Sequence, residues 1–340
     1  MKTILLDKHQ ADIVERPEPE LRFPEEVKVK LSYASIGGHD MMVFNGKMPP
    51  FYGKSLGMEA SAVVTQVGKS VAGYRVGDHV SFELVNACGL CRMCKRGLQS
   101  FCFNARDTVG QMQEYTVVHQ KQLVPLQKNV SLKEGCFMEP LALCLKCIES
   151  IPNIAGKRVL ILGGGAMGLI TLKALRLYPG AVVVLADPTE KKRALAERFG
   201  ADMVFNSKAL DYISNVLDYV DSEGYDAVIE TSGNPESAKL SVNFAARGGI
   251  VIFNGLYGMS FELPLNLFNC YWKDITIRAV YPPASPYYVS AGNILPKLGL
   301  SDIITKIYPF ERAAEAFRAK AAGGEAKVML DFTEQRFKVE

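Results

Sequence analysis

The sequence predicts an α/β protein of two domains, one rich in β-strands and one built on a doubly wound parallel sheet. Residues 1–143 combine short alternating apolar segments with Gly-rich turns, which is typical of antiparallel strands. Residues 144–280 alternate aliphatic segments with amphipathic ones, which indicates parallel strands that are buried on both faces and connected by helices. At 340 residues, the chain is long enough for two domains of ordinary size.

The β-rich part begins with two segments that have the pattern of strands, EEVKVKLSYASIG at 25–37 and EASAVVTQVGKSVAGYRVGDHVSFEL at 59–84. Glycines at 68, 73 and 77 would break any helix in the second segment. Residues 281–340, which begin with the Pro-rich YPPASP, contain one clear helix pattern, ERAAEAFRAKAAGG, and one strand, KVMLDF. They are too few for a separate domain, so we expect them to return to the first one.

The second domain begins with a buried strand in RVLILGGG at 158–165, followed by a helix in AMGLITLKALRLY that Pro179-Gly180 ends. A second strand, AVVVLAD, and a second helix, PTEKKRALAERFG, come next. The alternation continues with YDAVIET, a helix through ESAKLSVNFAA, and the strands GIVIFNG and ITIRAV. We therefore expect a Rossmann-type sheet over 144–280.

A glycine-rich loop joins the first strand and helix of this domain and fits the pattern G-x-G-x-x-G. Gly163 permits a tight turn, Gly165 lets the backbone approach a pyrophosphate, and Gly168 allows the helix to pack closely on the strand. Ala166 and Met167 open the helix, whose free N–H groups favour an anion. The loop therefore predicts a dinucleotide site.

Asp187 ends the next strand, where its carboxylate can accept hydrogen bonds from the two hydroxyl groups of the adenosine ribose. A carboxylate at this position repels a 2′-phosphate, which favours NAD(H) over NADP(H). Lys191, Lys192 and Arg193 follow closely and can help to bind a phosphate, although a solvated helix face explains them better.

Four of the eight cysteines lie in CGLCRMCKRGLQSFC, at positions 88, 91, 94 and 102. Four thiolates satisfy tetrahedral zinc and leave no position for a substrate, so we expect a structural zinc site. A ferredoxin-type cluster fits less well, because its cysteine run ends C-x3-C-P, whereas here the last gap is seven residues and Phe103 follows. Redox sensing by the same thiols is the remaining alternative.

Composition limits the partners and the compartment. The formal net charge is +3 without long runs of one sign, so we expect neither nucleic acid nor membranes as partners. The segment MKTILLDKHQ is too weakly apolar for a signal peptide. Clustered cysteines are typical of metal ligands in a reducing compartment, so we expect a cytoplasmic protein that acts on a small molecule.

These elements in this order resemble the zinc-containing medium-chain dehydrogenases, in particular their polyol (sorbitol-like) branch. Gly77-Asp78-His79-Val80, Gly110 with Glu114-Tyr115, and Glu139-Pro140-Leu141-Ala142 add to the resemblance. It implies a GroES-like catalytic domain over 1–143 and 281–340, with a structural zinc lobe at 88–102 held by Cys88, Cys91, Cys94 and Cys102. It also implies a homodimer or homotetramer assembled through the cofactor domain.

The resemblance implies a second, catalytic zinc as well, bound by the motifs C-G-[ST]-D and G-H-E and by a later acid or cysteine. This chain has Gly37-Gly38-His39-Asp40, Gly57-Met58-Glu59 and Glu139 instead. The cysteine ligand has become glycine and the histidine ligand methionine, whose thioether is a poor zinc ligand. We therefore expect no catalytic zinc.

His39 takes the place of the hydroxyl residue that relays protons in the family, and an imidazole can donate or accept that proton itself. In one hypothesis His39 performs acid–base chemistry with Glu59 or Glu139, whereas in another these three residues form a rearranged metal site. In a third, His39 and Met58 have only structural roles. As neighbours on an extended segment, His39 and Asp40 are expected to point in opposite directions.

The sequence thus predicts an NAD(H)-dependent oxidoreductase acting on a secondary alcohol or ketone, such as a sugar, polyol or cyclitol. A redox-neutral reaction with transient reduction of bound NAD, such as an epimerisation, is one alternative. A non-catalytic NAD(H)-binding protein is the other.

Overall fold

The computed structural model describes residues 1–50, 55–105 and 110–333. The chain divides into two compact units: unit 1 is Met1–Ala142 with Pro282–Glu340, and unit 2 is Leu143–Tyr281. The boundaries expected from the sequence lie one residue away from these. Helix α4 (Met138–Ile148) contains the first boundary.

Unit 1 is built around a seven-stranded sheet with the order β14-β15-β3-β4-β5-β7, and β6 pairs with β3 as well. In β3, Val27, Val29 and Leu31 are buried and the lysines between them are half-buried, as the alternating sequence requires. The strands of this sheet are β3 (Glu26–Ser35), β4 (Glu59–Val67), β5 (His79–Phe82), β6 (Tyr115–His119), β7 (Leu123–Pro125), β14 (Ile304–Pro309) and β15 (Lys327–Asp331).

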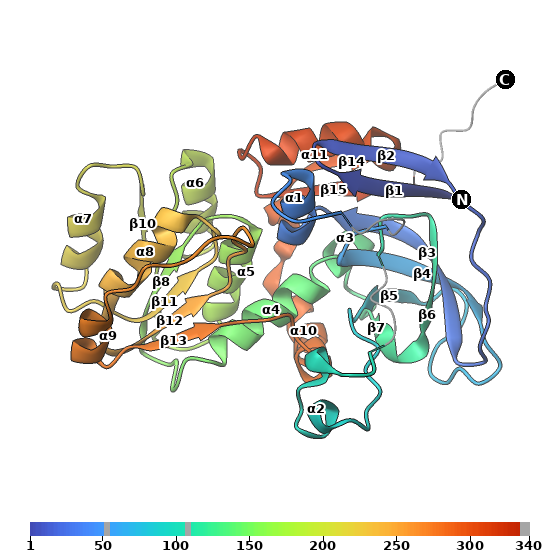
Figure 1. Cartoon of the computed structure of the whole chain (residues 1–340), viewed down its shortest axis with the longest axis horizontal. Helices are drawn as coiled ribbons and strands as arrows, with labels where there is room; N and C mark the ends of the chain where they lie inside the picture. Colours follow the sequence, from blue (N-terminus) through green and yellow to red (C-terminus); the bar gives the residue numbers. More distant parts are fainter. Residues whose placement is uncertain (51–54, 106–109, 334–340) are drawn as a thin grey trace. The chain divides into compact units, whose positions relative to one another are not determined.

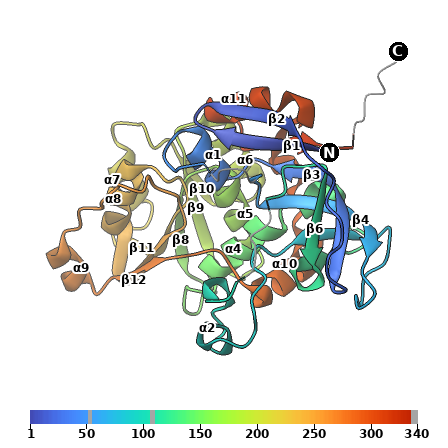
Figure 2. The same ribbon diagram turned by 45° about the vertical axis from the view of Figure 1, so that its right-hand side comes forward.

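The last strand enters the sheet beside one of the first. β15 pairs antiparallel with β3, with Met329 opposite Ser35, and parallel with β14. Helix α11 packs on β15 and on β2, beside the two-stranded ribbon β1–β2 (Figure 2). The remaining elements of this unit are β1 (Lys2–Asp7), β2 (Gln10–Glu15), α1 (Gly38–Phe44), α2 (Arg92–Lys95), η1 (Gln99–Phe101), η2 (Gln120–Gln122), α3 (Leu132–Gly135), α10 (Ser285–Leu298), η3 (Leu300–Ile303), η4 (Phe310–Arg312) and α11 (Ala313–Ala321).

The sequence pattern missed two elements of residues 281–340, helix α10 and strand β14. Pro286 lies in the first turn of α10, where its missing N–H has no intrahelical partner to lose. Pro296 lies inside the helix. Burial of Tyr288, Leu295 and Leu298 stabilises this helix in spite of that proline.

Unit 2 contains a six-stranded parallel sheet with the order β10-β9-β8-β11-β12-β13 (Figure 1). Numbered within the unit, this order is 3-2-1-4-5-6, as in dinucleotide-binding domains. The elements are β8 (Arg158–Leu162), α5 (Ala166–Leu175), β9 (Val182–Ala186), α6 (Glu190–Arg198), β10 (Met203–Phe205), α7 (Tyr212–Asp218), β11 (Tyr225–Glu230), α8 (Pro235–Phe244), β12 (Ala245–Phe253), α9 (Leu267–Lys273) and β13 (Thr276–Ala279).

Strands β8, β9 and β11 are buried on both faces, as their lack of alternation predicted, whereas β13 at the edge of the sheet is exposed. Val159 to Ile161 in β8 are fully buried. One face of the sheet, with Leu160 and Val184, packs against Val216 of α7 and Val242 of α8. Among the helices of the described ranges, none is long and apolar enough to cross a membrane.

Candidate functional site

The three glycines of the loop after β8 have the geometry that a dinucleotide loop needs. Gly163 has φ +113°, a conformation that side chains with a Cβ rarely adopt, and its N–H donates to the carbonyl of Ala186 at 2.8 Å. A Cβ on Gly168 would lie 1.9 Å from the carbonyl oxygen of Gly163, so only glycine lets α5 begin here. A Cβ on Gly165 would meet nothing within 4 Å, which leaves room for a ligand.

Helix α5 begins at Ala166, with Gly165 as its N-cap residue and Met167 in its first turn. No side chain caps this end, so its first N–H groups remain available to an anion. The loop therefore combines an open approach with the positive end of a helix.

Asp187 lies at the carboxyl end of β9 and is buried. Its Oδ2 accepts a hydrogen bond from the N–H of Gly164 at 2.7 Å, and its Oδ1 accepts one from the N–H of Thr189 at 2.8 Å. These bonds hold the acid against the glycine loop. Asp187, Gly163, Ser207 and Lys208 line one pocket of about 330 Å³ within unit 2.

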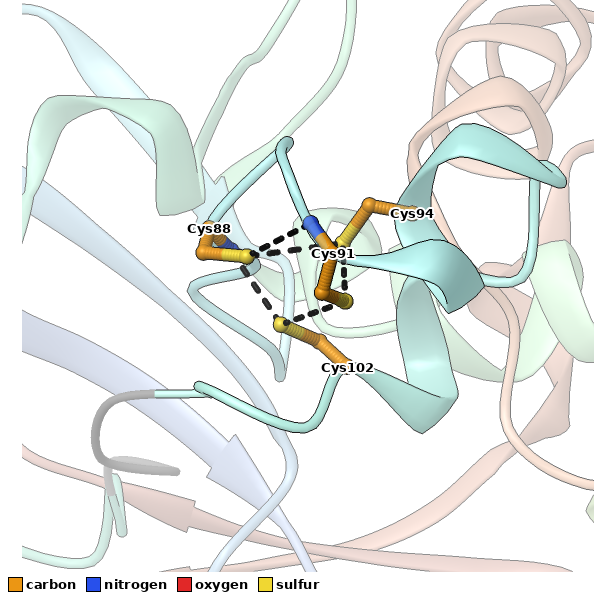
Figure 3. A group of neighbouring side chains, drawn as sticks. All are labelled: Cys88, Cys91, Cys94 and Cys102. Carbon is orange, nitrogen blue, oxygen red and sulfur yellow. Dashed lines mark hydrogen bonds between the residues drawn. The ribbon is translucent and has the colours of Figure 1, made fainter.

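The four cysteines of residues 88–102 turn their sulfur atoms toward a common point (Figure 3). The Sγ atoms of Cys91 and Cys94 are 3.5 Å apart, those of Cys91 and Cys102 are 3.8 Å apart, and those of Cys88 and Cys94 are 4.0 Å apart. Four sulfurs at ~2.3 Å from a tetrahedral zinc ion would lie ~3.8 Å from one another. The residues therefore fit a structural zinc ion.

Backbone N–H groups add to this fit. Those of Leu90 and Cys91 donate to Cys88 Sγ at 3.4 and 3.3 Å, and together they lower the pKa of Cys88 to about 6. A thiolate, rather than a thiol, is the form that binds zinc. In the described part of the chain, these cysteines are the one group of His, Cys, Asp and Glu whose ligand atoms come this close together.

Glu59 begins β4 and lies in a buried cluster of charged side chains that the sequence indicated only in part. Its carboxylate accepts a hydrogen bond from Ser35 Oγ and forms an ion pair with Lys327 Nζ. The side chains of Lys327 and Glu59 are only 3% and 7% exposed. The strand register brings these three side chains together. Ser35 pairs with Glu59 across β3 and β4, and β15 flanks β3 on the other side.

Asp40, in α1, is the second acid of this cluster and is 1% exposed. Its carboxylate oxygens accept hydrogen bonds from the N–H groups of Gly37 at 2.8 Å and Gly57 at 3.1 Å. Burial raises the pKa of Asp40 to about 7, and the charge of Glu59 acts in the same direction. The two N–H groups and the Lys327 ammonium oppose this shift.

Glu139, in the first turn of α4, is the third acid and is also buried. Burial raises its pKa to about 8, with a further contribution from the charge of Glu59. Lys327 lowers the pKa and Asp40 raises it. Tyr288 of α10 is buried and interacts electrostatically with Glu139. We name Asp40, Glu59, Glu139 and Lys327 the acid–lysine cluster.

His39 is half-buried in α1, and burial lowers its pKa. The expectation that His39 and Asp40 lie on an extended segment is wrong, because α1 begins at Gly38 and both residues are helical. Neighbours in a helix diverge by about 100° rather than 180°. The ligand atoms of His39, Glu59 and Glu139 do not come together in the way the cysteine sulfurs do.

Gly37 precedes α1 and touches the acid–lysine cluster. A Cβ at this position would lie 2.6 Å from Oε1 of Glu59 and 3.4 Å from Oδ2 of Asp40. The Glu59 carboxylate therefore fills the space that a larger residue at 37 would need.

The sequence did not predict that Lys327 and Ser35 belong to this cluster. A lysine at the start of the apolar strand KVMLDF is nevertheless a visible signal of a buried charge.

Comparison with known proteins gives two family matches. Residues 23–128 match the alcohol dehydrogenase GroES-like domain, and residues 166–288 match the zinc-binding dehydrogenase domain. The first match lies in unit 1, and the second lies in unit 2 except for its last residues. The fold is thus the GroES-like and Rossmann-like pair that the sequence predicted.

Individual proteins agree with these matches. The L-threonine 3-dehydrogenase of Pyrococcus furiosus is 31% identical over 322 residues, which are 90% of this chain and 91% of that protein. The probable D-xylulose reductase A of Aspergillus clavatus is 28% identical over 338 residues, 95% of this chain and 94% of that protein. A putative zinc-binding dehydrogenase from Sinorhizobium meliloti 1021, solved bound to NADP, is 26% identical with a TM-score of 0.89, covering 97% and 98% of the two chains.

Proposed function

This chain belongs to the zinc-type medium-chain dehydrogenase family, and from that premise we propose that it is an NAD(H)-dependent oxidoreductase of a secondary alcohol or ketone. Within the alcohol and polyol dehydrogenases, we place it in the polyol (sorbitol-like) branch. The probable D-xylulose reductase, which aligns over nearly the whole chain, supports a sugar, polyol or cyclitol as substrate. The observation that carries the proposal is the loop of Gly163, Gly165 and Gly168 with Asp187 bonded against it.

NAD(H) is the proposed cofactor because the Asp187 carboxylate lies in the pocket beside this loop, where it would repel a 2′-phosphate. Lys208 lines the same pocket and is the side chain that could offset this repulsion. Arg193 instead donates to the backbone carbonyl of Asp187 at 2.8 Å. The ratio of kcat/KM with NAD to that with NADP tests this choice, and a preference for NADP would contradict it.

We propose that no catalytic zinc takes part, because the donors around Gly37 do not fit one. Position 37 offers no side chain, and the thioether of Met58 is a poor zinc ligand. The Glu59 carboxylate is already engaged by an ammonium and a hydroxyl group. The four cysteines would then hold the single zinc ion of the chain.

In this proposal, His39 is the acid–base residue. Its lowered pKa keeps the imidazole unprotonated near neutral pH, so in alcohol oxidation the imidazole takes the proton of the substrate hydroxyl group. The glycine loop and Asp187 would hold the dinucleotide, which would supply the hydride acceptor for the carbon that carries this hydroxyl group. In the reverse direction, the imidazolium returns the proton to the carbonyl oxygen. Glu139, which is largely protonated near neutral pH, is the proton reserve that we propose, and the charge of Glu59 contributes to its raised pKa.

The test is a substrate screen followed by one substitution. Secondary alcohols and polyols are assayed with NAD, and ketones, sugars and enones with NADH. On any substrate found, His39→Ala should lower kcat/KM by ~10²–10⁴-fold. His79→Ala is the matched control, because His79 is exposed in β5. An unchanged rate in His39→Ala would remove this residue from the mechanism.

The same screen separates the alternatives. Tight NADH binding without turnover on any substrate class would favour a non-catalytic NAD(H)-binding protein. Conversion of one sugar epimer into another without net consumption of NAD would favour a redox-neutral reaction.

Assembly and location belong to the proposal as well. We propose a homodimer or homotetramer formed through unit 2, because β13 is an edge strand with its four residues exposed. Exposed apolar side chains of the neighbouring α9 support this, namely Leu267, Phe268, Tyr271 and Trp272. Light scattering measures the mass, and a monomer would contradict the assembly.

We place the protein in the cytoplasm, which the lack of a disulfide among its eight cysteines supports.

A further inference from the structure

The carboxyl ends of three neighbouring strands of the unit 2 sheet lie in register. Glu230, which ends β11, pairs with Leu162 of β8 on one side and with Phe253 of β12 on the other. The glycine loop follows Leu162, and Asn254 follows Phe253, so both lie at the same edge of the sheet. Neighbouring strands are ~4.8 Å apart, which places Asn254 ~10 Å from the strand that carries the loop. A dinucleotide held at the loop is long enough to reach it.

The proposed ribose acid indicates in which direction a dinucleotide runs along this edge. Asp187 follows β9, which lies beside β8 on the side away from β11. With the adenosine ribose at Asp187 and the pyrophosphate at the glycine loop, the second nucleotide extends the other way, over β11 and β12. The nicotinamide therefore lies toward Asn254.

The side chain of Asn254 is the feature of this edge that the fold itself does not explain. The residue is only 8% exposed, and among the described residues neither its Oδ1 nor its Nδ2 has a hydrogen-bond partner. A buried amide without partners is unfavourable, because it has lost its hydrogen bonds to water and gained none. By contrast, Asn234 and Asn266 of the same unit each cap a helix with Oδ1. The amide of Asn254 therefore remains available to a ligand.

The backbone around Asn254 is held firmly in place. The N–H groups of Asn254 and Gly255 donate to the carbonyl of Glu230 at 2.8 and 2.9 Å. The carboxylate of Glu230 accepts hydrogen bonds from the Tyr257 hydroxyl group and, at 3.2 Å, from the N–H of Gly233. These bonds fix the segment after β12 against the segment after β11. The side chain of Asn254, which no hydrogen bond holds, can still turn toward a ligand.

The donor and acceptor of an asparagine amide match those of a second primary amide. Its oxygen accepts hydrogen bonds and its NH₂ group donates them. The nicotinamide ring carries a carboxamide with the same two groups, so the two amides can form a pair of hydrogen bonds. The adenine, ribose and phosphate groups of the cofactor carry no such amide.

We propose that the side chain of Asn254 binds the carboxamide of the nicotinamide. Its Oδ1 accepts a hydrogen bond from the carboxamide NH₂ group, and its Nδ2 donates one to the carboxamide oxygen. This pairing fixes the rotation of the nicotinamide ring, whereas the glycine loop holds the pyrophosphate. The inference rests on the proposed function in taking a nicotinamide dinucleotide as the ligand, and binding alone tests it, without any substrate.

Two ligands that share the adenosine half provide the direct test, because NADH carries the nicotinamide and ADP-ribose does not. We expect Asn254→Leu, which removes both polar atoms at similar size, to weaken NADH binding by ~10–100-fold and ADP-ribose binding by less than ~2-fold. Calorimetric titration of the full chain measures both affinities. Asn254→Ala removes the same atoms without filling the space and should give the same pattern. Asn243→Leu, at an exposed position of α8, is the control and should leave both affinities unchanged. Equal losses for the two ligands would overturn the proposal.

A dinucleotide analogue identifies the partner of the amide. In reduced 3-acetylpyridine adenine dinucleotide, a methyl group replaces the NH₂ group of the carboxamide, and the rest of the ligand is retained. The unchanged chain should bind NADH ~5–20-fold more tightly than this analogue, and Asn254→Leu should bind the two equally. If Asn254→Leu kept the full preference for NADH, another group would bind the carboxamide and the proposal would be wrong.

Stability of the ligand-free chain separates a binding role from a structural one. Because the Asn254 amide pairs with nothing in the fold, Asn254→Leu should raise the unfolding temperature by ~2–4 °C. Asn234→Leu is the matched comparison, since it removes the hydrogen bonds that cap α8 and should lower this temperature by ~2–4 °C. A fall in Asn254→Leu as large as that in Asn234→Leu would show that the amide supports the fold, which would overturn the proposal.

Failure of this inference is distinguishable from failure of the proposed function. A chain that turns over no substrate but shows a loss confined to NADH in Asn254→Leu would contradict the function and support the carboxamide site. A chain that binds neither NADH nor NADPH would overturn both. An active chain whose Asn254 variants bind NADH as tightly as the unchanged chain would overturn the inference alone.

Discussion

Unit 1 contains two clusters of side chains that could attract a cation, and they are built in opposite ways. The cysteine lobe gathers four equivalent donors from the short segment 88–102, and three pairs of their sulfur atoms lie 3.5–4.0 Å apart. The acid–lysine cluster draws its members from β4, α1, α4 and β15. The first surrounds a space for an ion, whereas the second contains a cation of its own. The number of acidic groups is therefore a poor guide to metal binding unless the charges beside them are known.

Removing one donor from the cysteine lobe should have the largest effect. Cys94→Ser should lower the zinc content from one ion per chain to nearly none and disorder residues 88–102, because zinc binding in such small lobes supplies ~10 kcal/mol of folding free energy. Elemental analysis and limited proteolysis measure this.

Cys270→Ser is the control, since Cys270 is half-buried in unit 2, far from the lobe in the sequence. Retention of full zinc occupancy in Cys94→Ser would show that the lobe is not the metal site.

The acid–lysine cluster should instead make stability depend on pH. Glu139 and Asp40 have pKa values raised to about 8 and about 7, so between pH 5 and 7 the folded state holds protons that the unfolded state has released. Stability should therefore fall as the pH rises, by up to ~1.4 kcal/mol per pH unit for each carboxyl group. Glu139→Gln should flatten this fall and stabilise the chain at pH 8, as measured by urea unfolding.

Glu20→Gln, at an exposed position of unit 1, should leave the pH dependence unchanged. A Glu139→Gln variant with the pH profile of the unchanged chain would show that Glu139 holds no additional proton when folded.

The contact between Gly37 and Glu59 should give the smallest effect. Gly37→Ala places a Cβ 2.6 Å from Oε1 of Glu59, and since this is the end of a side chain that can shift, we expect a loss of ~1–3 kcal/mol. The backbone adds no strain, because Gly37 has φ −90°. Chemical unfolding measures the loss.

Gly324→Ala is the matched control, with nothing within 4 Å of its added Cβ. Equal stability of the two variants would mean that Glu59 does not occupy the space beside Gly37.

These differences explain which features the sequence predicts. The glycine loop, Asp187 and the four cysteines are local patterns, and the structure places them as their spacing implied. The ion pair of Glu59 with Lys327 depends on which strands become neighbours, so no local pattern contains it. The sequence predicts an extended segment at His39 and Asp40, which follow the expected strand of residues 25–37, whereas the chain turns there into α1.

The placement of Lys327 on β15 has a consequence for the order in which the molecule is made. Unit 1 is discontinuous, and all of unit 2 is synthesised between Glu59 and Lys327. While the nascent chain still lacks β15, the carboxylate of Glu59 has no counter-ion and its burial is unfavourable. The ribosome must therefore complete unit 2 before unit 1 can close its interior, so the unit whose synthesis begins first is the last to be completed.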